Sequence, residues 1–274
     1  MKSCVPKVLQ TVGGRAMIIH VLETAAQLEP AGLHVVYNPA TPAVKDACAD
    51  FAVTWAEQVE QLGTGHAVQQ ALPAVADGAD VLVLYGDIPL LEPAVLRELI
   101  ASPSDGLKVL TMQVDDPHGY GRIVRNRDGC VIKIIEESDA TDAQKFICEV
   151  NSGIIMAPCQ VLRSCLEHMV SDNSQNEYYL TDIFAIAHAR GIGCTAVIAP
   201  DAADLEGAND RVQLSVLERR YRMKKTTELM RSGVQLADPD RVDIRGKVNV
   251  GRDVFVDVNV ILEGEIVLGD NVHI

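Results

Sequence analysis

Short apolar runs alternate with stretches of helical periodicity along most of the chain. Runs rich in Val, Ile and Leu have the length of buried strands and lie at 33–38, 51–58, 81–84, 108–114, 150–158 and 194–200. Before and between these runs, apolar residues recur at helical spacing and predict helices near 17–25, 65–76, 93–101, 159–170 and 180–190. This alternation predicts an α/β fold with a doubly wound, mostly parallel sheet.

The segment from Gly121 to Glu137 interrupts this rhythm. Two apolar stretches flank residues 126–129, and the Asp128-Gly129 pair is a typical hairpin turn. We therefore expect an inserted hairpin lobe beside the crevice of the sheet.

The last part of the chain has two further patterns. Residues 212–230 predict one long charged helix, which is typical of a solvated linker between domains. After it, aliphatic residues recur every six positions, at Ile244, Val250, Val256, Leu262, Leu268 and Ile274. Such a period is typical of hexapeptide repeats in a parallel β-helix, where each short strand forms one side of a triangular coil.

These patterns predict three parts: an α/β domain over 1–211, a linker helix over 212–232 and the start of a hexapeptide-repeat domain over 233–274. A repeat domain is stable when about three or more coils stack and polar caps close its ends. The chain ends at Ile274 within a repeat and without such a cap. We therefore expect the repeat domain to be cut short.

Composition narrows the function classes. The formal net charge is −14, which disfavours nucleic acids and anionic membranes as partners. Seven cysteines without a C-x-x-C pair predict neither a disulfide framework nor a zinc site, and they suit a reducing compartment. Because neither a signal peptide nor a long apolar run is present, we expect a cytoplasmic protein.

Asp87 is the first candidate for chemistry. It follows the predicted strand 81–84, and ligands of open α/β sheets bind beyond the carboxyl ends of the strands. Gly86 allows the backbone to approach a ligand closely. An aspartate in this place can hold Mg²⁺, which prefers carboxylates together with phosphate oxygens. The alternative is that Asp87 only caps the turn before Pro89.

Three other polar positions are weaker candidates. The glycine loop at 60–67 exposes backbone N–H groups at a helix start, although Thr64 as an ordinary N-cap explains it as well. Lys7 can bind phosphate or lie on the surface, and Asn209 can complete a metal site or form a turn. His66 and His118 are expected to be structural or exposed rather than acid–base groups.

The stretches PKVLQ, EQLGTGHA, YGDIPLL, DDPHGYGRIV, VNSGI, NEYYLTD and LEGANDR, in this order, resemble one family. It is the bacterial bifunctional N-acetylglucosamine-1-phosphate uridyltransferase/glucosamine-1-phosphate acetyltransferase. The resemblance covers essentially the whole chain. It implies a nucleotidyltransferase that joins UTP and N-acetylglucosamine 1-phosphate into UDP-N-acetylglucosamine and pyrophosphate, with Mg²⁺ as cofactor and a homotrimeric assembly.

The resemblance also implies residue roles. Catalysis would rest on Lys7, which neutralises phosphate charge, and on Asp87. Mg²⁺ would be held by Asp87 and Asn209. The uracil would be bound by Gln58, Gly63 and Thr64. This role replaces the hypothesis that the glycine loop binds an anion. The sugar and ribose side would be lined by Tyr85, Gly86, Gly121, Glu136 and Asn151.

The chain departs from the family pattern at both ends. The family opens with a glycine-rich segment that forms the first strand and a loop over the triphosphate, whereas this chain begins MKSCVPK. The acetyltransferase residues of the family lie in later repeats. We therefore expect little uridyltransferase activity from this exact chain. The alternatives are a remnant that binds nucleotide or oligomerises, and a glucose-1-phosphate nucleotidyltransferase.

Overall fold

Strand β9 (Glu149–Pro158) organises the main sheet of the chain. In the computed structural model, which describes residues 1–274, β9 is antiparallel to β5 (Asp80–Val83), β6 (Leu107–Gln113) and β7 (Arg122–Arg125). Residues 152–157 of β9 are buried without a break, so both faces of the sheet are covered there.

Two more strands complete this sheet, which has six strands. β10 (Cys194–Ile198) runs parallel to β6, and β8 (Val131–Ile135) forms the predicted antiparallel hairpin with β7. The pairings give β5, β6, β7 and β10 one direction and β8 and β9 the other. The chain thus has a mixed α/β fold whose sheet strands mostly share one direction.

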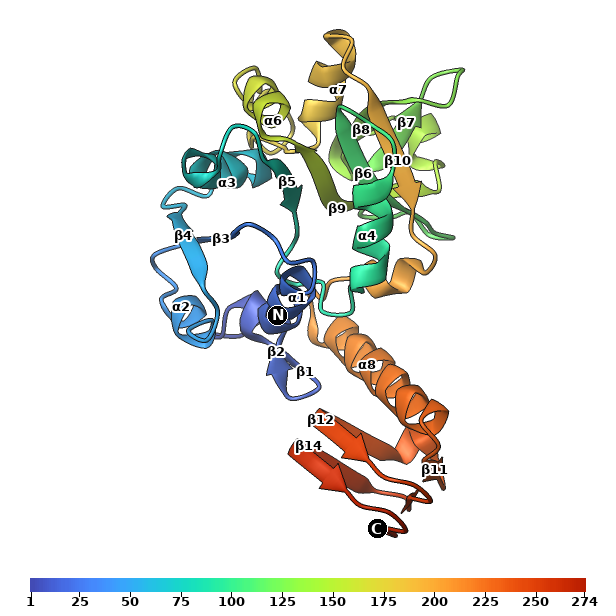
Figure 1. Cartoon of the computed structure of the whole chain (residues 1–274). Helices are drawn as coiled ribbons and strands as arrows, with labels where there is room; N and C mark the ends of the chain where they lie inside the picture. The colour runs from blue at the N-terminus through green and yellow to red at the C-terminus, as the bar shows by residue number, and fades with distance from the viewer. The chain divides into compact units, whose positions relative to one another are not determined.

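Helices cover both faces of this sheet (Figure 1). Leu107 and Val109 of β6 share a core cluster with α3 (Thr64–Ala71), α6 (Cys159–Leu166) and α7 (Asp182–Ala189). Between them in sequence, Lys108 points the opposite way and its Nζ donates to Ile100 O in α4 (Pro93–Ala101) at 2.7 Å. Helix α4 therefore lies on the face opposite to α6 and α7.

Strands β3 (Leu33–Tyr37) and β4 (Val53–Glu57) form a separate parallel two-stranded sheet. They do not pair with any strand of the six-stranded sheet. Tyr37 and Trp55 pack edge to face between these strands, with ring centroids 5.3 Å apart. The short helix α2 (Ala43–Ala47) connects them, and its five residues gave no detectable helical period.

By its contacts the chain divides into two compact units. The larger unit consists of Leu22–Tyr85 and Leu91–Leu205, and the smaller unit of Met1–Val21, Gly86–Leu90 and Glu206–Ile274. Neither unit contains a helix that is both long and apolar enough to span a bilayer.

The smaller unit contains the long helix predicted from the charge pattern, α8 (Arg211–Arg231). A hairpin that the sequence interpretation missed, β1 (Thr11–Val12) and β2 (Arg15–Ala16), turns at two glycines with positive φ and precedes α1 (Met17–Ala26). His20 Nε2 lies 2.8 Å from Val12 O, and its ring packs edge to face on Tyr221 of α8. This packing fixes the hairpin against the helix within the smaller unit.

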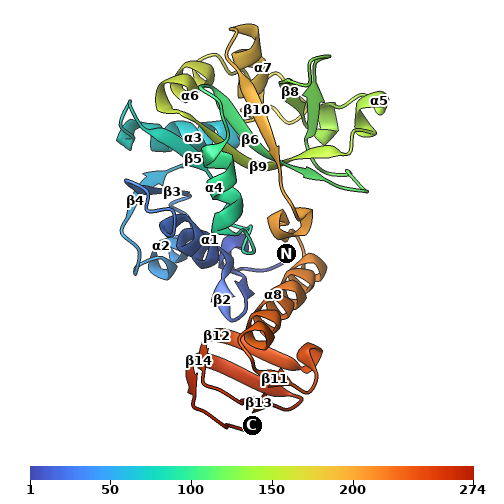
Figure 2. The same ribbon diagram turned by 45° about the vertical axis from the view of Figure 1, so that its right-hand side comes forward.

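The end of the chain forms two parallel strand pairs (Figure 2). They are β11 (Gln235–Leu236) with β13 (Phe255–Val256), and β12 (Val242–Val250) with β14 (Val260–Leu268). Ile244 pairs with Leu262, which is three six-residue repeats further along the chain. The aliphatics of the six-residue period at 244, 250, 256, 262 and 268 all belong to one core cluster, which Ile274 does not join.

Candidate active site

Lys7, Asp87 and Asn209 meet in the smaller unit. Lys7 Nζ forms an ion pair with Asp87 Oδ2 and donates to Asn209 Oδ1 at 2.6 Å. The Asp87 side chain is 19% exposed and that of Lys7 is 36% exposed, so the contact is partly shielded from water. Three residues assigned from the motifs are thus in direct contact although they are distant in sequence.

Local structure places each of these side chains. Lys7 begins a 3-10 turn directly after Pro6, whose ring fixes the backbone φ there. Asn209 precedes α8, where its N–H donates to Gln213 Oε1 at 2.6 Å and Asp210 caps the helix. A methyl group at Gly207 would lie 3.0 Å from Asp87 Oδ2, so the loop before Asn209 runs close along the carboxylate.

The arrangement suits a hard divalent cation. Two oxygen atoms, one carboxylate and one amide, converge on a single ammonium, which stands where a positive charge is stabilised. No group of three or more His, Cys, Asp or Glu residues that could hold a metal occurs in the structure. A cation at Asp87 and Asn209 would therefore take its other ligands from water and substrate, as Mg²⁺ commonly does.

The glycine loop of the larger unit is fixed by its own backbone and by residues 178–180. Gln58 Nε2 donates to Gly63 O at 3.1 Å, Tyr178 N donates to Leu62 O, and Gly65 N donates to Tyr178 O, both at 2.8 Å. Gly63 has φ +109°, and a Cβ there would lie 2.6 Å from Tyr178 O. The loop therefore requires glycine at this position.

Thr64 is not the N-cap that one sequence alternative predicted. Helix α3 begins at Thr64 with Gly63 as its N-cap, and Thr64 Oγ1 instead accepts from Leu180 N at 3.0 Å. His66 lies between two amides, with Gln58 Nε2 at 3.2 Å and Gln70 Nε2 at 3.0 Å. Its contacts are those of a structural histidine, as expected.

Gly121, Glu136 and Asn151 lie together in the larger unit. A Cβ at Gly121 would be 3.4 Å from Glu136 Oε2 and 3.5 Å from Asn151 Cβ. Gly121 O also accepts from Asn151 N at 2.8 Å. These three motif residues, assigned to the sugar side, thus form one group: Gly121 directly precedes β7, Glu136 directly follows β8, and Asn151 lies in β9.

Tyr85 joins this group through Gly153. Asn151 Oδ1 accepts from Gly153 N at 2.9 Å, and Gly153 has φ +85°. A Cβ at Gly153 would overlap the Tyr85 ring, so the ring lies directly on the glycine. The next residue, Gly86, belongs to the smaller unit, where a Cβ would lie 3.4 Å from Val8 and 3.6 Å from Ile18.

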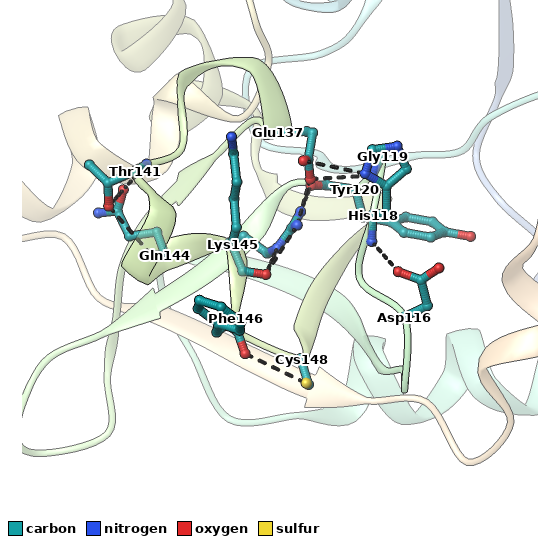
Figure 3. A network of polar contacts seen from close by, with 11 residues as sticks. Asp116, His118, Gly119, Tyr120, Glu137, Thr141, Gln144, Lys145, Phe146 and Cys148 are labelled. Atoms are coloured by element: carbon teal, nitrogen blue, oxygen red, sulfur yellow. Dashed lines mark hydrogen bonds and ion pairs between the residues drawn. The ribbon is translucent and has the colours of Figure 1, made fainter.

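A buried arginine supports the sugar-side group. Arg122 is 1% exposed and forms an ion pair with Glu137, and its guanidinium also donates to Tyr120 O and Lys145 O. Figure 3 shows Glu137 between the 118–120 turn and Lys145. The Arg122 hydrogen bond holds the pKa of Glu137 below its usual range. Because Arg122 follows Gly121 and Glu137 follows Glu136, this pair holds the backbone at Gly121 and Glu136 in place.

Two carboxyl groups, Glu136 of this group and Asp182 beside it, have raised pKa values. Burial, with the charge of Asp139 adding to it, raises the pKa of Glu136, whereas a hydrogen bond from Thr181 opposes the rise. Burial and the charges of Glu136 and Asp139 raise the pKa of Asp182 to about 6. Thr181, Asp182 and Arg122 were not among the site residues expected from the sequence, although all three lie in the family motifs NEYYLTD and DDPHGYGRIV.

Comparison with known proteins agrees with this fold. Residues 1–176 match the family model of the MobA-like NTP transferase domain, and the chain belongs to this family of nucleotidyltransferase enzymes. Over its full length the chain is 47% identical to the bifunctional protein GlmU of Alkalilimnicola ehrlichii. It is 48% identical to the bifunctional proteins GlmU of Stenotrophomonas maltophilia and Pseudomonas putida. The resemblance inferred from the sequence motifs is thereby confirmed.

The coverage of these relatives is partial. The chain spans 59% of the Alkalilimnicola protein and 60% of each of the other two. Among solved structures, a putative glucose-1-phosphate thymidylyltransferase from Bacillus anthracis matches with a TM-score of 0.57 at 20% identity, over 78% of this chain and 85% of that chain. This likeness concerns the fold alone.

Proposed function

We propose that this chain is a uridyltransferase that forms UDP-N-acetylglucosamine. A phosphate oxygen of N-acetylglucosamine 1-phosphate attacks the α-phosphorus of UTP, the bond from that phosphorus to the bridging oxygen of the β-phosphate breaks, and pyrophosphate leaves. The observation that carries the proposal is the Lys7 ammonium held between Asp87 and Asn209. The sequence motifs imply these substrates, and the match of the whole chain to part of the relatives named bifunctional protein GlmU supports the nucleotidyltransferase class.

Each group of residues has a part in this proposal. Lys7 offsets negative charge on the transferred group. Asp87 and Asn209 would hold Mg²⁺, which supplies further charge neutralisation at the phosphates when bound. Gln58, Gly63 and Thr64 recognise uracil. Tyr85, Gly86, Gly121, Glu136 and Asn151 hold the sugar and ribose. Since no covalent step falls to the protein, catalysis consists of positioning and charge stabilisation.

The test is a pyrophosphate-release assay on the whole chain. UTP with N-acetylglucosamine 1-phosphate should release pyrophosphate faster than UTP or ATP with glucose 1-phosphate, and chelation with EDTA should abolish release. A preference for glucose 1-phosphate would defeat the proposed substrate. Release that persists in EDTA would defeat the role of Asp87 and Asn209.

One observation favours a second candidate, a protein that binds the product without turnover. The sheet of β3 and β4, which precedes Gln58, shares no hydrogen-bonded ladder with β5, which precedes Asp87. Residues that act in one reaction would then be less firmly positioned. Binding of UDP-N-acetylglucosamine in calorimetry together with no pyrophosphate release would identify this case.

We further propose that residues 233–274 begin a left-handed hexapeptide β-helix. The pairing of Ile244 with Leu262 and of Val250 with Leu268 supports it, because a triangular coil of three hexapeptides brings residues eighteen apart into register. Through this segment the protein would assemble as a homotrimer. Light scattering after gel filtration distinguishes trimer from monomer.

A further inference from the structure

Thr181 is a buried hydroxyl with an unusual partner. It directly precedes α7, where a threonine side chain commonly caps the helix, yet its side chain makes no cap hydrogen bond. Instead Thr181 Oγ1 donates to Glu136 Oε1 at 2.8 Å, and Thr181 is 4% exposed. The other carboxylate oxygen, Oε2, faces Gly121. One oxygen of Glu136 thus accepts a hydrogen bond from Thr181, while the other faces Gly121, one of the residues proposed to bind the sugar.

The backbone around Thr181 is itself fixed on the other side. Leu180 N donates to Thr64 Oγ1 at 3.0 Å, and Tyr178 exchanges backbone hydrogen bonds with Leu62 and Gly65. The segment 178–181 therefore contacts the glycine loop with its backbone and Glu136 with its last side chain. This gives the Thr181 hydroxyl a defined position relative to the carboxylate.

From this geometry we infer that Thr181 is a positioning residue that orients Glu136 toward the sugar. The inference rests on the proposed function, which assigns Glu136 to sugar recognition. An ionised carboxylate accepts hydrogen bonds strongly from sugar hydroxyl or amide groups, whereas a protonated one does so weakly. Burial disfavours the ionised form of Glu136, so a hydrogen bond to it has a direct consequence for ligand affinity.

Several other titratable groups lie near Glu136, and a pH experiment must distinguish their titration from that of Glu136. Asp139 lies on the turn that follows Glu136, and Asp182 faces it from α7. A cavity of about 570 Å³ that Glu136 lines is also lined by the titratable groups Lys133, His168, Asp172 and Tyr179. Thr181 is set apart from all of these because it donates a hydrogen bond without titrating.

The experiment measures calorimetric binding of UDP-N-acetylglucosamine and of UMP to the whole chain between about pH 5 and about pH 8. In Thr181→Val, affinity for UDP-N-acetylglucosamine should fall about tenfold, because a hydrogen bond to a charged group is lost. UMP affinity should stay unchanged. The pH at which UDP-N-acetylglucosamine affinity declines should also shift upward, since the pKa of Glu136 rises without the hydroxyl. Thr181→Ser should restore both values.

Thr24→Val is the matched control. Thr24 is a threonine of the same unit that is 7% exposed and donates to the backbone oxygen of Leu91 at 3.0 Å. The Thr24→Val variant should bind UDP-N-acetylglucosamine and UMP with the affinities of the wild type. If Thr181→Val does not fold, Thr181→Ala replaces it in the binding experiment, after thermal melting has shown that this variant is folded. Loss of folding in both Thr181 variants would overturn the inference by showing a structural role.

The remaining outcomes separate the inference from the proposed function. A wild type that does not bind UDP-N-acetylglucosamine would defeat the proposed function, and the inference with it. A wild type that binds, with Thr181→Val unchanged in affinity and in pH dependence, would defeat the inference alone.

Discussion

Lys7 and Asp87 form an ion pair across a long separation in sequence. The ammonium occupies a position in which a carboxylate oxygen and the amide oxygen of Asn209 both point at positive charge. In the presence of nucleotide, phosphate oxygens would compete for Lys7 and release Asp87 for a divalent cation. The pair therefore connects two proposed roles, charge neutralisation by Lys7 and metal binding by Asp87.

Substitution of Asp87 tests the metal role. In Asp87→Ala the pyrophosphate-release rate should fall by about a thousandfold, because charge stabilisation of the transferred phosphate is lost. Binding of Mn²⁺ in the presence of UDP-N-acetylglucosamine, followed by electron paramagnetic resonance, should weaken in parallel. The melting temperature should change little, since the side chain is partly exposed.

The matched control for Asp87 lies on the same segment. Asp80 begins β5 and is exposed. Asp80→Asn should keep the rate and the Mn²⁺ affinity of the wild type. A rate in Asp87→Ala equal to that of Asp80→Asn would contradict the assignment of Asp87.

Gly63 provides a test of the proposed uracil loop. Gly63→Ala places a Cβ 2.6 Å from Tyr178 O at a φ of +109°, so the loop and residue 178 must separate. We expect a loss of about 2 kcal/mol in the free energy of unfolding and about tenfold weaker UMP binding. Urea denaturation and calorimetry measure the two effects.

Gly129→Ala separates backbone strain from steric overlap at Gly63. Gly129 has φ +82° with no atom within 4 Å of a Cβ, and it lies in the same unit at the hairpin turn. The Gly129→Ala variant should lose about 1 kcal/mol in the free energy of unfolding and bind UMP as the wild type does. Equal losses in the two variants would show that Gly63 serves backbone conformation alone.

Much of the fold was predictable because its elements carry local signals. The apolar runs at 108–114 and 150–158 are buried on both faces and became β6 and β9, and the charged stretch became α8. The hairpin at Gly13–Gly14 and helix α5 (Asp142–Lys145) were missed, although the glycine pair and the Thr141–Gln144 capping box are detectable signals. Their two- to four-residue elements are too short to show a hydrophobic period.

The residues of the candidate site could be predicted only where they lie in the family motifs. The contact between Lys7, Asp87 and Asn209 follows from tertiary structure, and no spacing in the chain predicts it. The same holds for Thr181 and Glu136, which meet because α7 packs on β8. The antiparallel placement of β9 among its neighbours was likewise not readable from apolar content, because a strand buried on both faces looks the same in either direction.

Asp182 predicts a pH dependence of stability. Its pKa is raised from 3.8 to about 6 in the folded protein, so folding favours the neutral acid. Its contribution to stability is full below about pH 4 and is lost as pH rises through about 6. Asp182→Asn should therefore match the wild type near pH 4 and be more stable by about 2 kcal/mol near pH 7.5.

Urea unfolding at the two pH values measures this difference. Asp142 is the control, since it is an exposed aspartate in the first turn of α5. Asp142→Asn should change the free energy of unfolding by less than about 0.5 kcal/mol at both pH values. A stability gain for Asp182→Asn that is the same at both pH values would contradict the titration of Asp182.

The six-residue period makes opposite predictions for neighbouring isoleucines of one strand pair. Ile244 of β12 is 3% exposed within the aliphatic cluster, whereas Ile261 of β14, paired with Asp243, is 55% exposed. Ile244→Ala should lower the free energy of unfolding by about 3 kcal/mol, because it leaves a cavity in the cluster. Ile261→Ala should lower it by less than about 0.5 kcal/mol. Amide hydrogen exchange at β12 is the suitable measurement, because the single tryptophan, Trp55, reports on the larger unit. Equal costs would mean that the period does not mark the inward face, and the proposed β-helix coil would lose its main support.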